Sequence, residues 1–175
     1  MKKTIFILFL ICVILTIPWS KVSAKDEMEC DLYKEEINTV QVFNLSENKT
    51  INITEDDLYL MAQVVYAESC SEPYEGKVAV ASVILNRVKS TGFPKSIEGV
   101  IKQKNAFSCI RNGKINVIPD EASYKAVLDA LKGIDPTNNA HFFYNPKIST
   151  SKWMDQVSKV NIKPIGNHVF FAVNK

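Results

Sequence analysis

A glutamate that follows an apolar run is the residue whose position first suggests catalysis. Glu68 comes directly after VVYA at residues 64–67, where the hydrophobic spacing predicts a buried helix. A surface carboxylate costs nothing, whereas a buried one is expensive unless it is paired or used. An acid at the end of this helix would be partly desolvated, which favours the neutral form that a general acid needs. The residues alone leave two interpretations open, a paired structural acid and a catalytic one.

Two neighbouring acids have a simpler interpretation. Glu72 and Glu75 come at the start of the next expected helix, which Pro73 opens. Acids in a first turn are favoured by the helix dipole, so both are interpreted as structural.

Metal and thiol chemistry receive less support from the spacing. The two histidines, His141 and His168, are 27 residues apart without a ligand motif, so we expect no metal and no cofactor. Cys109 is followed by a turn sequence, IRNGK, rather than by a helix that would activate a nucleophile. A structural thiol or half of a disulfide is therefore expected there, with Cys70 as its partner in an exported protein.

Four helices are expected to position these residues. The first begins after Thr54, an N-cap followed by acids, and runs to residue 67 or 68. Pro73 starts the second, whose sequence GKVAVASVILNRVK is apolar enough for a buried central helix. A short helix is expected near residues 95–102. Asp120 then caps a helix over EASYKAVLDALK that ends at Gly133.

The C-terminal third of the sequence is prone to form β-strands. HFFY at residues 141–144 and HVFFAV at 168–173 are aromatic, β-prone runs that we expect to pair as a small sheet. The Asn-Gly pair in FSCIRNGK, residues 107–114, predicts a tight turn. The predicted fold class is α+β, mainly α, with a small antiparallel β element.

The N-terminus predicts export. Residues 1–24 combine lysines, a short apolar stretch and a small-residue cleavage site, as in a secretory signal; an uncleaved anchor is the alternative. Residues 25–53 are interpreted as an acidic, weakly structured leader, and residues 54–175 as the functional domain. Without the signal, 21 − 3 = 18 basic residues face 19 acidic ones, and the net charge of +2 becomes about −1. That charge gives no support to a nucleic-acid partner.

The distribution of charge suggests a different kind of partner. Residues 77–114 contain eight basic residues and one acid, Glu98. This basic middle would suit an anionic polymer, although solvated helix faces would give the same pattern.

A family resemblance covers residues 57–173. The segment 64–88, VVYAESCSEPYEGKVAVASVILNRV, closely resembles the opening motif of the SleB/CwlJ family of cell-wall hydrolases, best known as spore-cortex-lytic enzymes. Further matches follow in order: FP at 93–94, VI at 100–101, FS at 107–108, DPT at 135–137, FFYNPK at 142–147, Trp153, and IGNHVF at 165–170.

The resemblance implies a lysozyme-like, mostly helical domain whose one catalytic glutamate falls on Glu68. Similar members cleave peptidoglycan between N-acetylmuramic acid and N-acetylglucosamine as lytic transglycosylases. The acid protonates the leaving oxygen and then takes a proton from the C6 hydroxyl of the muramic acid, which closes a 1,6-anhydro ring. No second carboxylate is needed, in contrast with ordinary glycosidases.

The remaining motif residues are predicted to form a substrate groove and its scaffold. The predicted substrate-binding residues are Asn86, Phe107, Ser108, Tyr144, Asn145 and His168. Helix packing is the alternative for Asn86, and a structural histidine is the alternative for His168.

Two departures from the family pattern keep other functions open. SleB-like proteins often carry a separate peptidoglycan-binding domain, for which residues 25–53 are too short, and CwlJ-like proteins generally lack an export signal. The predicted function is an exported peptidoglycan lytic transglycosylase of the spore cortex, active in germination. A non-catalytic peptidoglycan-binding module and a lysozyme-type hydrolase of the vegetative wall are the alternatives. Peptidoglycan is the expected partner, and an activating or inhibiting protein is left open.

Overall fold

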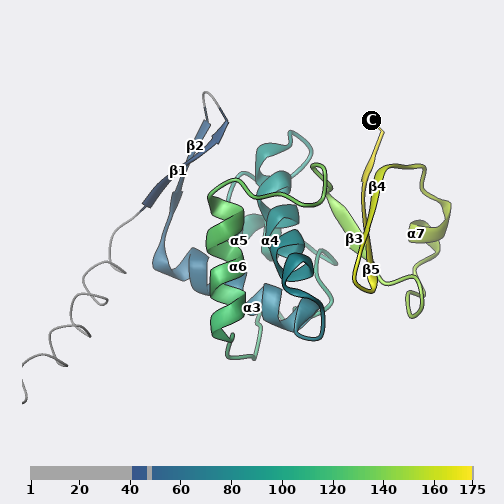
Figure 1. Cartoon of the computed structure of the whole chain (residues 1–175), viewed down its shortest axis with the longest axis horizontal. Helices are drawn as coiled ribbons and strands as arrows, with labels where there is room; N and C mark the ends of the chain where they lie inside the picture. Colours follow the sequence, from purple (N-terminus) through teal and green to yellow (C-terminus); the bar gives the residue numbers. More distant parts are fainter. Residues whose placement is uncertain (1–40, 47–48, 175) are drawn as a thin grey trace, which may run out of the picture. The chain divides into compact units, whose positions relative to one another are not determined.

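The computed structural model describes residues 41–46 and 49–174, so the predicted signal and residues 25–40 of the leader lie outside it. Its helices and strands follow one another in this order: β1 Gln41–Ser46, β2 Lys49–Ile53, α3 Glu55–Ser69, α4 Tyr74–Lys89, α5 Ile97–Ile101, α6 Glu121–Leu131, β3 Phe142–Tyr144, α7 Lys152–Gln156, β4 Lys159–Ile165 and β5 His168–Val173 (Figure 1).

The first two strands form a hairpin inside the segment that was interpreted as a weakly structured leader. β1 and β2 pair antiparallel, with Val42 opposite Asn52 and Phe43 opposite Ile51. Valine, isoleucine and phenylalanine favour β-strands, and here their preference outweighs the acidic composition of the leader. Ile53, at the end of β2, is buried and joins the hydrophobic core.

Local capping signals set the start of α3. The Thr54 hydroxyl accepts a hydrogen bond from the Asp57 amide, and the Asp57 carboxylate accepts one from the Thr54 amide. This reciprocal pair is a capping box, and it confirms the predicted N-terminus. The helix then continues to Ser69 and so contains Glu68 in its last turn.

The central helix of the domain is α4. Every residue from Gly76 to Val88 is buried, as the apolar sequence predicts. Pro73 is the N-cap rather than the first helical residue, one position from the expectation. Helices α3, α5 and α6 pack against α4, and α3 also packs against α5 and α6 (Figure 1).

The other predicted boundaries are close to the observed ones. Asp120 caps α6 by accepting a hydrogen bond from the Ser123 amide, and Gly133 follows the helix with a φ of +98°. The turn at Asn112 and Gly113 is also confirmed, since both residues have positive φ and Arg111 bridges to Lys114.

The C-terminal strands form the predicted small sheet, with an addition. β5 lies between β3 and β4 in an antiparallel sheet of order β3-β5-β4, and Phe142 is opposite Phe171. Neither β4 nor α7 was predicted from the sequence. β4 is largely polar and contains Pro164, which a strand tolerates at the edge of a sheet. A mainly helical domain with a small antiparallel sheet confirms the predicted fold class.

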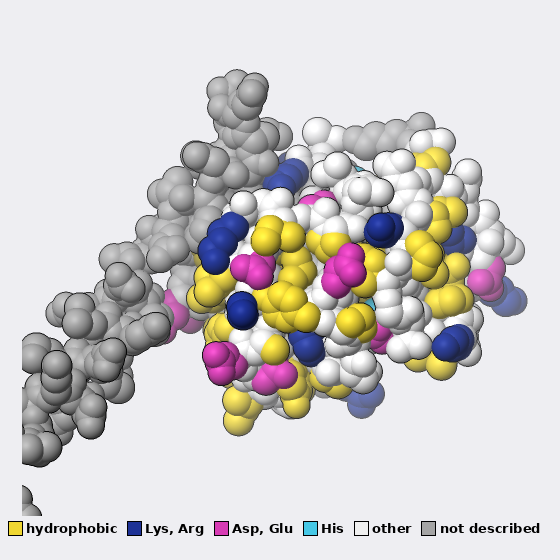
Figure 2. Space-filling view, viewed as in Figure 1, with side chains coloured by type: hydrophobic (Ala, Val, Ile, Leu, Met, Phe, Trp, Pro, Cys, Tyr) yellow, Lys and Arg dark blue, Asp and Glu magenta, His cyan; other side chains and the backbone are white. Residues whose placement is uncertain are grey.

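The basic middle is only partly on the surface. Lys77 and Arg87 are buried, and Lys102 pairs with Glu98 one helical turn away. On the face shown in Figure 2, basic and acidic side chains are interspersed. Within the described residues, no helix is long and apolar enough to cross a membrane.

Candidate active site

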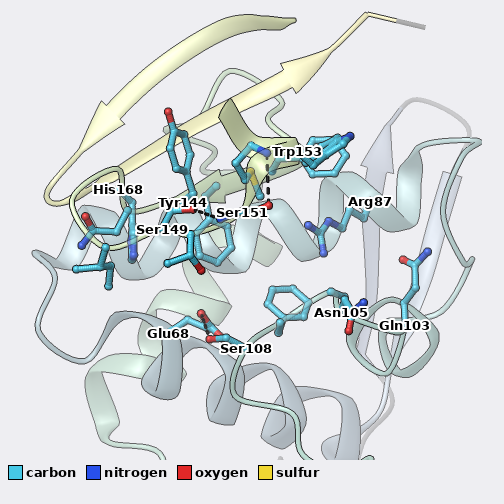
Figure 3. A pocket seen from close by; sticks show the side chains of 18 of the residues that line it. Glu68, Arg87, Gln103, Asn105, Ser108, Tyr144, Ser149, Ser151, Trp153 and His168 are labelled. Carbon is cyan, nitrogen blue, oxygen red and sulfur yellow. Dashed lines mark hydrogen bonds between the residues drawn. The ribbon is translucent and has the colours of Figure 1, made fainter. Parts of the chain in front are cut away.

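The last turn of α3 presents Glu68 to a loop that lies far away in the sequence. The half-buried Glu68 carboxylate accepts a hydrogen bond from the Ser108 hydroxyl, at 3.0 Å to Oε1 and 3.3 Å to Oε2. Oε1 also accepts one from the Cys109 backbone amide at 3.0 Å. Figure 3 shows Glu68 and Ser108 side by side along one wall of the pocket. The carboxylate is therefore fixed in orientation, yet no cation neutralises it through any of these contacts.

A buried lysine fixes the end of the helix that carries Glu68. The Lys77 ammonium, on α4, donates hydrogen bonds to the carbonyl oxygens of Ser69 at 2.9 Å and Cys70 at 3.3 Å. These carbonyls have no partner within the helix, and a positive charge there complements the helix dipole. Lys77 thus anchors the turn that immediately follows Glu68.

Glu72 has a partner that its position in the sequence does not suggest. Its carboxylate accepts hydrogen bonds from the Asn167 backbone amide, at 2.8 Å, and from the Asn167 side-chain amide, at 3.1 Å. It therefore holds the β4–β5 turn, and the interpretation of Glu72 as a first-turn acid was wrong. Burial opposes ionisation, but these hydrogen bonds, with the charges of His168 and Lys147, hold the pKa of Glu72 below its ordinary value. Glu75, by contrast, lies exposed in the first turn of α4.

An open groove of about 750 Å³ lies beside Glu68. The residues that line it are Glu68, Arg87, Phe93, Gln103, Lys104, Asn105, Ala106, Phe107, Ser108, Phe142, Phe143, Tyr144, Asn145, Ile148, Ser149, Thr150, Ser151, Trp153, Met154 and His168. Figure 3 shows Glu68 and Ser108 facing Tyr144, Ser149 and Ser151 across this space. Among these residues, all of which the structure describes, Glu68 is the only carboxylic acid.

The hollow surface continues along the loop that forms one wall of the groove. A second pocket of about 550 Å³ shares five lining residues with the first, Gln103, Lys104, Asn105, Phe107 and Ser108. It extends to Asn112 and Gly113 in the tight turn. An extended ligand could therefore follow this loop past Glu68.

The structure brings six of the seven predicted site residues to the groove. Those that line it are Glu68, Phe107, Ser108, Tyr144, Asn145 and His168. Asn86 is 4% exposed and is not among the lining residues. Its amide donates to Asp135 Oδ2 at 2.9 Å and to the Ala140 carbonyl at 3.2 Å. Asn86 holds the loop before β3, which is the packing role that was the alternative.

His168 lies in the groove among aromatic rings. Its ring meets Phe143 and Phe170 edge-on, at centroid distances of 5.3 and 6.1 Å. Its Nδ1 atom is buried and has no hydrogen-bond partner in the described part of the chain. His168 therefore lies where a contact with substrate was predicted, and that contact stays a prediction beside the structural alternative.

Several groove residues were not among the predicted ones. Trp153, on α7, is 47% exposed and was noted only as a family landmark. Arg87 was interpreted as part of the buried helix, and the polar loop at residues 103–105 was not assigned to the site. Their common feature is that they reach the groove through tertiary packing. The match of Trp153 to the family motif was the one signal that could have identified it.

The two described cysteines are free thiols, so the expected Cys70–Cys109 disulfide is wrong for this structure. Cys70 is exposed at the end of α3, whereas Cys109 is half-buried beside Glu68. Burial, together with the adjacent Glu68 carboxylate, raises the pKa of the Cys109 thiol to about 12. A thiol held neutral in this way is a poor nucleophile.

Metal ligands do not cluster at the site. In the part of the chain that the structure describes, no group of three or more His, Cys, Asp or Glu side chains could hold a metal ion. The groove itself combines one carboxylic acid with hydroxyl, amide, aromatic, imidazole and basic side chains.

The comparison with known proteins decides the family. The model of the Cell Wall Hydrolase family matches residues 71–171, which include every groove residue except Glu68. The chain belongs to the cell wall hydrolase family. Its fold is similar to a crystal structure of the catalytic domain of the SleB protein of Bacillus cereus, with 45% identity and a TM-score of 0.62 over 73% of this chain and 96% of that chain.

Two further similar proteins agree with this assignment. The catalytic domain of the germination-specific lytic transglycosylase SleB from Bacillus anthracis is 47% identical, with a TM-score of 0.63, covering 68% of this chain and 96% of that one. A spore cortex-lytic enzyme of Bacillus cereus is 46% identical over 136 residues, which are 75% of this chain and 52% of the relative. The chain spans about half the length of the curated relatives it matches.

Proposed function

We propose that this protein is a peptidoglycan lytic transglycosylase that acts on the spore cortex during germination, with Glu68 as its acid and base. The observation that carries the proposal is a single carboxylate in an open groove, held by Ser108 and the Cys109 amide. Relatives described as spore cortex-lytic enzymes and as a germination-specific lytic transglycosylase support the substrate and the reaction.

A single carboxylate suffices for this reaction if the substrate supplies the nucleophile. Protonated Glu68 gives its proton to the glycosidic oxygen that leaves with N-acetylglucosamine, while the bond to C1 of N-acetylmuramic acid breaks. The Glu68 carboxylate then takes the proton of the muramic acid C6 hydroxyl, whose oxygen bonds to C1. No water is consumed, and Glu68 ends protonated for the next cycle. A hydrolase with two carboxylates would need a second acid in the groove.

The groove walls suit an N-acetylated glycan strand. Trp153 offers an exposed aromatic face, and its ring packs against Phe142 with centroids 5.1 Å apart. Sugar rings bury their apolar faces on such rings. The side-chain amides of Gln103, Asn105 and Asn145 can exchange hydrogen bonds with N-acetyl groups.

Export belongs to the same proposal, because cortex peptidoglycan lies outside the cytoplasmic membrane. Support comes from the sequence of residues 1–24, which lie outside the described residues. N-terminal sequencing of the protein isolated from spores tests this point. A mature chain that starts at Lys25 supports cleavage of a signal, and a chain that starts at Met1 contradicts it.

The proposal is tested by the loss of turbidity of purified cortex sacculi. The wild-type chain should clear them, and Glu68→Gln should be inactive while keeping its fold and its binding to sacculi. Glu75→Gln is the matched control, because Glu75 is exposed in the first turn of α4. A wild-type chain that binds sacculi without clearing them would favour the non-catalytic binding module. An active Glu68→Gln variant would remove Glu68 from the mechanism.

A further inference from the structure

Arg87 is a buried cation at the edge of the groove. It lies on α4, its side chain is 5% exposed, and its Nε–H donates a hydrogen bond to the His141 carbonyl oxygen at 2.7 Å. Three aromatic rings enclose the guanidinium, whose central carbon is 5.5 Å from the ring centroid of Phe93, 5.0 Å from that of Phe107 and 5.6 Å from that of Phe142. This cage fixes the position of the guanidinium and shields most of it from bulk water.

Arg87 has no anionic partner within the described part of the chain. The salt bridges there join Lys102 to Glu98 and Lys132 to Asp129. Burial lowers the pKa of Arg87 to about 10, so the group is still charged at neutral pH. Contacts with aromatic faces offset part of the cost of burying a cation, but an unpaired buried charge is unfavourable. Such a charge is explained if the counter-ion arrives with a ligand.

The free side of the guanidinium opens into the groove. Arg87 lines the same groove as Glu68, and Figure 3 shows its guanidinium extending from α4 into the space between Trp153 on one wall and Asn105 on the other. Since Nε carries the one hydrogen bond to the described chain, the two terminal nitrogens keep four N–H donors. A planar pair of donors in a fixed orientation matches the two oxygens of a carboxylate.

We propose that Arg87 forms an anion subsite that binds a carboxylate attached to the muramic acid unit of the glycan strand. The inference rests on the proposed function. N-acetylmuramic acid differs from N-acetylglucosamine by a lactyl ether that ends in a carboxyl group, and this group is either free or extended by a peptide with its own carboxylates. A subsite for either carboxylate would distinguish the two alternating sugars.

Such a distinction has a consequence for the reaction. The anhydro ring closes on muramic acid, so the strand must bind in the register that places this sugar beside Glu68. A carboxylate subsite at a fixed position relative to Glu68 selects that register. Arg87 is thus a specificity-determining residue, separate from the acid and base.

Ligand binding to the full-length Glu68→Gln chain, measured by NMR titration, tests the subsite without cleavage. The ligands are N-acetylmuramic acid, its methyl ester, N-acetylglucosamine, and an N-acetylmuramoyl peptide whose carboxylates lie only on the peptide. We expect the free acid to bind at least tenfold more tightly than its ester or N-acetylglucosamine if the lactyl carboxylate is the ligand. Preferential binding of the muramoyl peptide would assign the subsite to the peptide carboxylate.

Adding Arg87→Gln should abolish this preference and leave the affinity for N-acetylglucosamine unchanged. Arg87→Lys, which keeps the charge but loses the planar fork, should retain part of it. The Glu68→Gln chain, which keeps Arg87, also tests the proposal by itself if Arg87→Gln does not fold. Equal affinity of this chain for the acid, the muramoyl peptide, the ester and N-acetylglucosamine would overturn the proposal. An unchanged preference in folded Arg87→Gln would also overturn it. If the Glu68→Gln chain prefers the carboxylate ligands but the wild-type chain cleaves no sacculi, the proposed function is refuted and the anion subsite is not.

Discussion

The Glu68 carboxylate accepts a hydrogen bond from the backbone amide of Cys109, 41 residues further along the chain. Together with the Ser108 hydroxyl, this amide fixes an acid that α3 carries but does not orient. Neither donor is charged. The orientation of the acid therefore depends on the loop that leads from Phe107 into the Asn112–Gly113 turn, as well as on the helix.

Replacing Ser108 by alanine should lower kcat about tenfold, because one donor that orients Glu68 is lost while the Cys109 amide stays. Loss of one hydrogen bond to a charged group costs roughly 1.5 kcal/mol, which corresponds to about that factor in rate. The measurement is the rate of sacculus solubilisation as a function of sacculus concentration. Ser158→Ala, at an exposed serine that does not line the groove, should behave as wild type. A Ser108→Ala variant with wild-type kcat would show that the hydroxyl does not orient the acid.

The contact between Glu72 and Asn167 should make stability depend on pH. The pKa of Glu72 is held below its ordinary value of 4.5 in the folded protein, so the ionised group stabilises the fold above that pH. This contribution is lost as the pH falls through the folded-state pKa. Glu72→Gln should therefore reduce the free energy of unfolding by about 1 kcal/mol at pH 7 and by much less at pH 3.

Urea unfolding at the two pH values measures this difference. Glu75→Gln provides the matched control, and its effect should be small at both pH values because Glu75 is exposed. If Glu72→Gln were equally destabilising at pH 3 and pH 7, the ionised carboxylate would not be what holds the β4–β5 turn.

Gly166 should tolerate no side chain. It has a φ of +59°, and a Cβ there would lie 2.0 Å from Glu72 Oε2 and 2.8 Å from Pro73 Cδ. Gly166→Ala should lower the free energy of unfolding by roughly 3 kcal/mol, because backbone strain and displacement of Glu72 both contribute. Gly113→Ala isolates the strain, since Gly113 has a φ of +73° with nothing within 4 Å of a new Cβ. Its cost should be about 1 kcal/mol. Equal costs for the two variants in thermal or urea unfolding would contradict close packing at the turn.

The two described cysteines should differ in their reaction with iodoacetamide. Burial and the Glu68 carboxylate raise the pKa of Cys109 to about 12, so almost no thiolate is present at pH 8. Cys70 is exposed. Peptide mass mapping over time should show Cys70 alkylated well before Cys109. Unfolding in urea should abolish the difference, and faster labelling of Cys109 in the folded chain would contradict the observed environment.

Local sequence signals predicted the helices because their determinants lie within a few residues. Thr54 and Asp57 form the capping box of α3 without help from the rest of the fold. The same holds for Asp120 at α6 and for the Asn112–Gly113 turn. The aromatic strands at 142–144 and 168–173 were predictable as a pair because both are strongly β-prone.

Features that depend on distant packing were not predictable. Glu72 accepts a hydrogen bond from Asn167, 95 residues away, and no nearby residue in the sequence predicts that contact. The cage around Arg87 is assembled from three separate segments. β4 was not predicted because its sequence, KVNIKPI, is polar and contains a proline. Its extended conformation depends on pairing with β5.

Mass spectrometry of the fragments released from cortex sacculi tests the central claim most directly. The full chain and Glu68→Gln are incubated with sacculi in ¹⁸O-labelled water, and the ends of the soluble fragments are identified. We predict fragments that end in 1,6-anhydromuramic acid, each lighter by one water than a reducing end and free of ¹⁸O, and none with Glu68→Gln. Reducing ends that carry ¹⁸O would contradict the account, because they would make water the nucleophile in place of the muramic acid C6 hydroxyl.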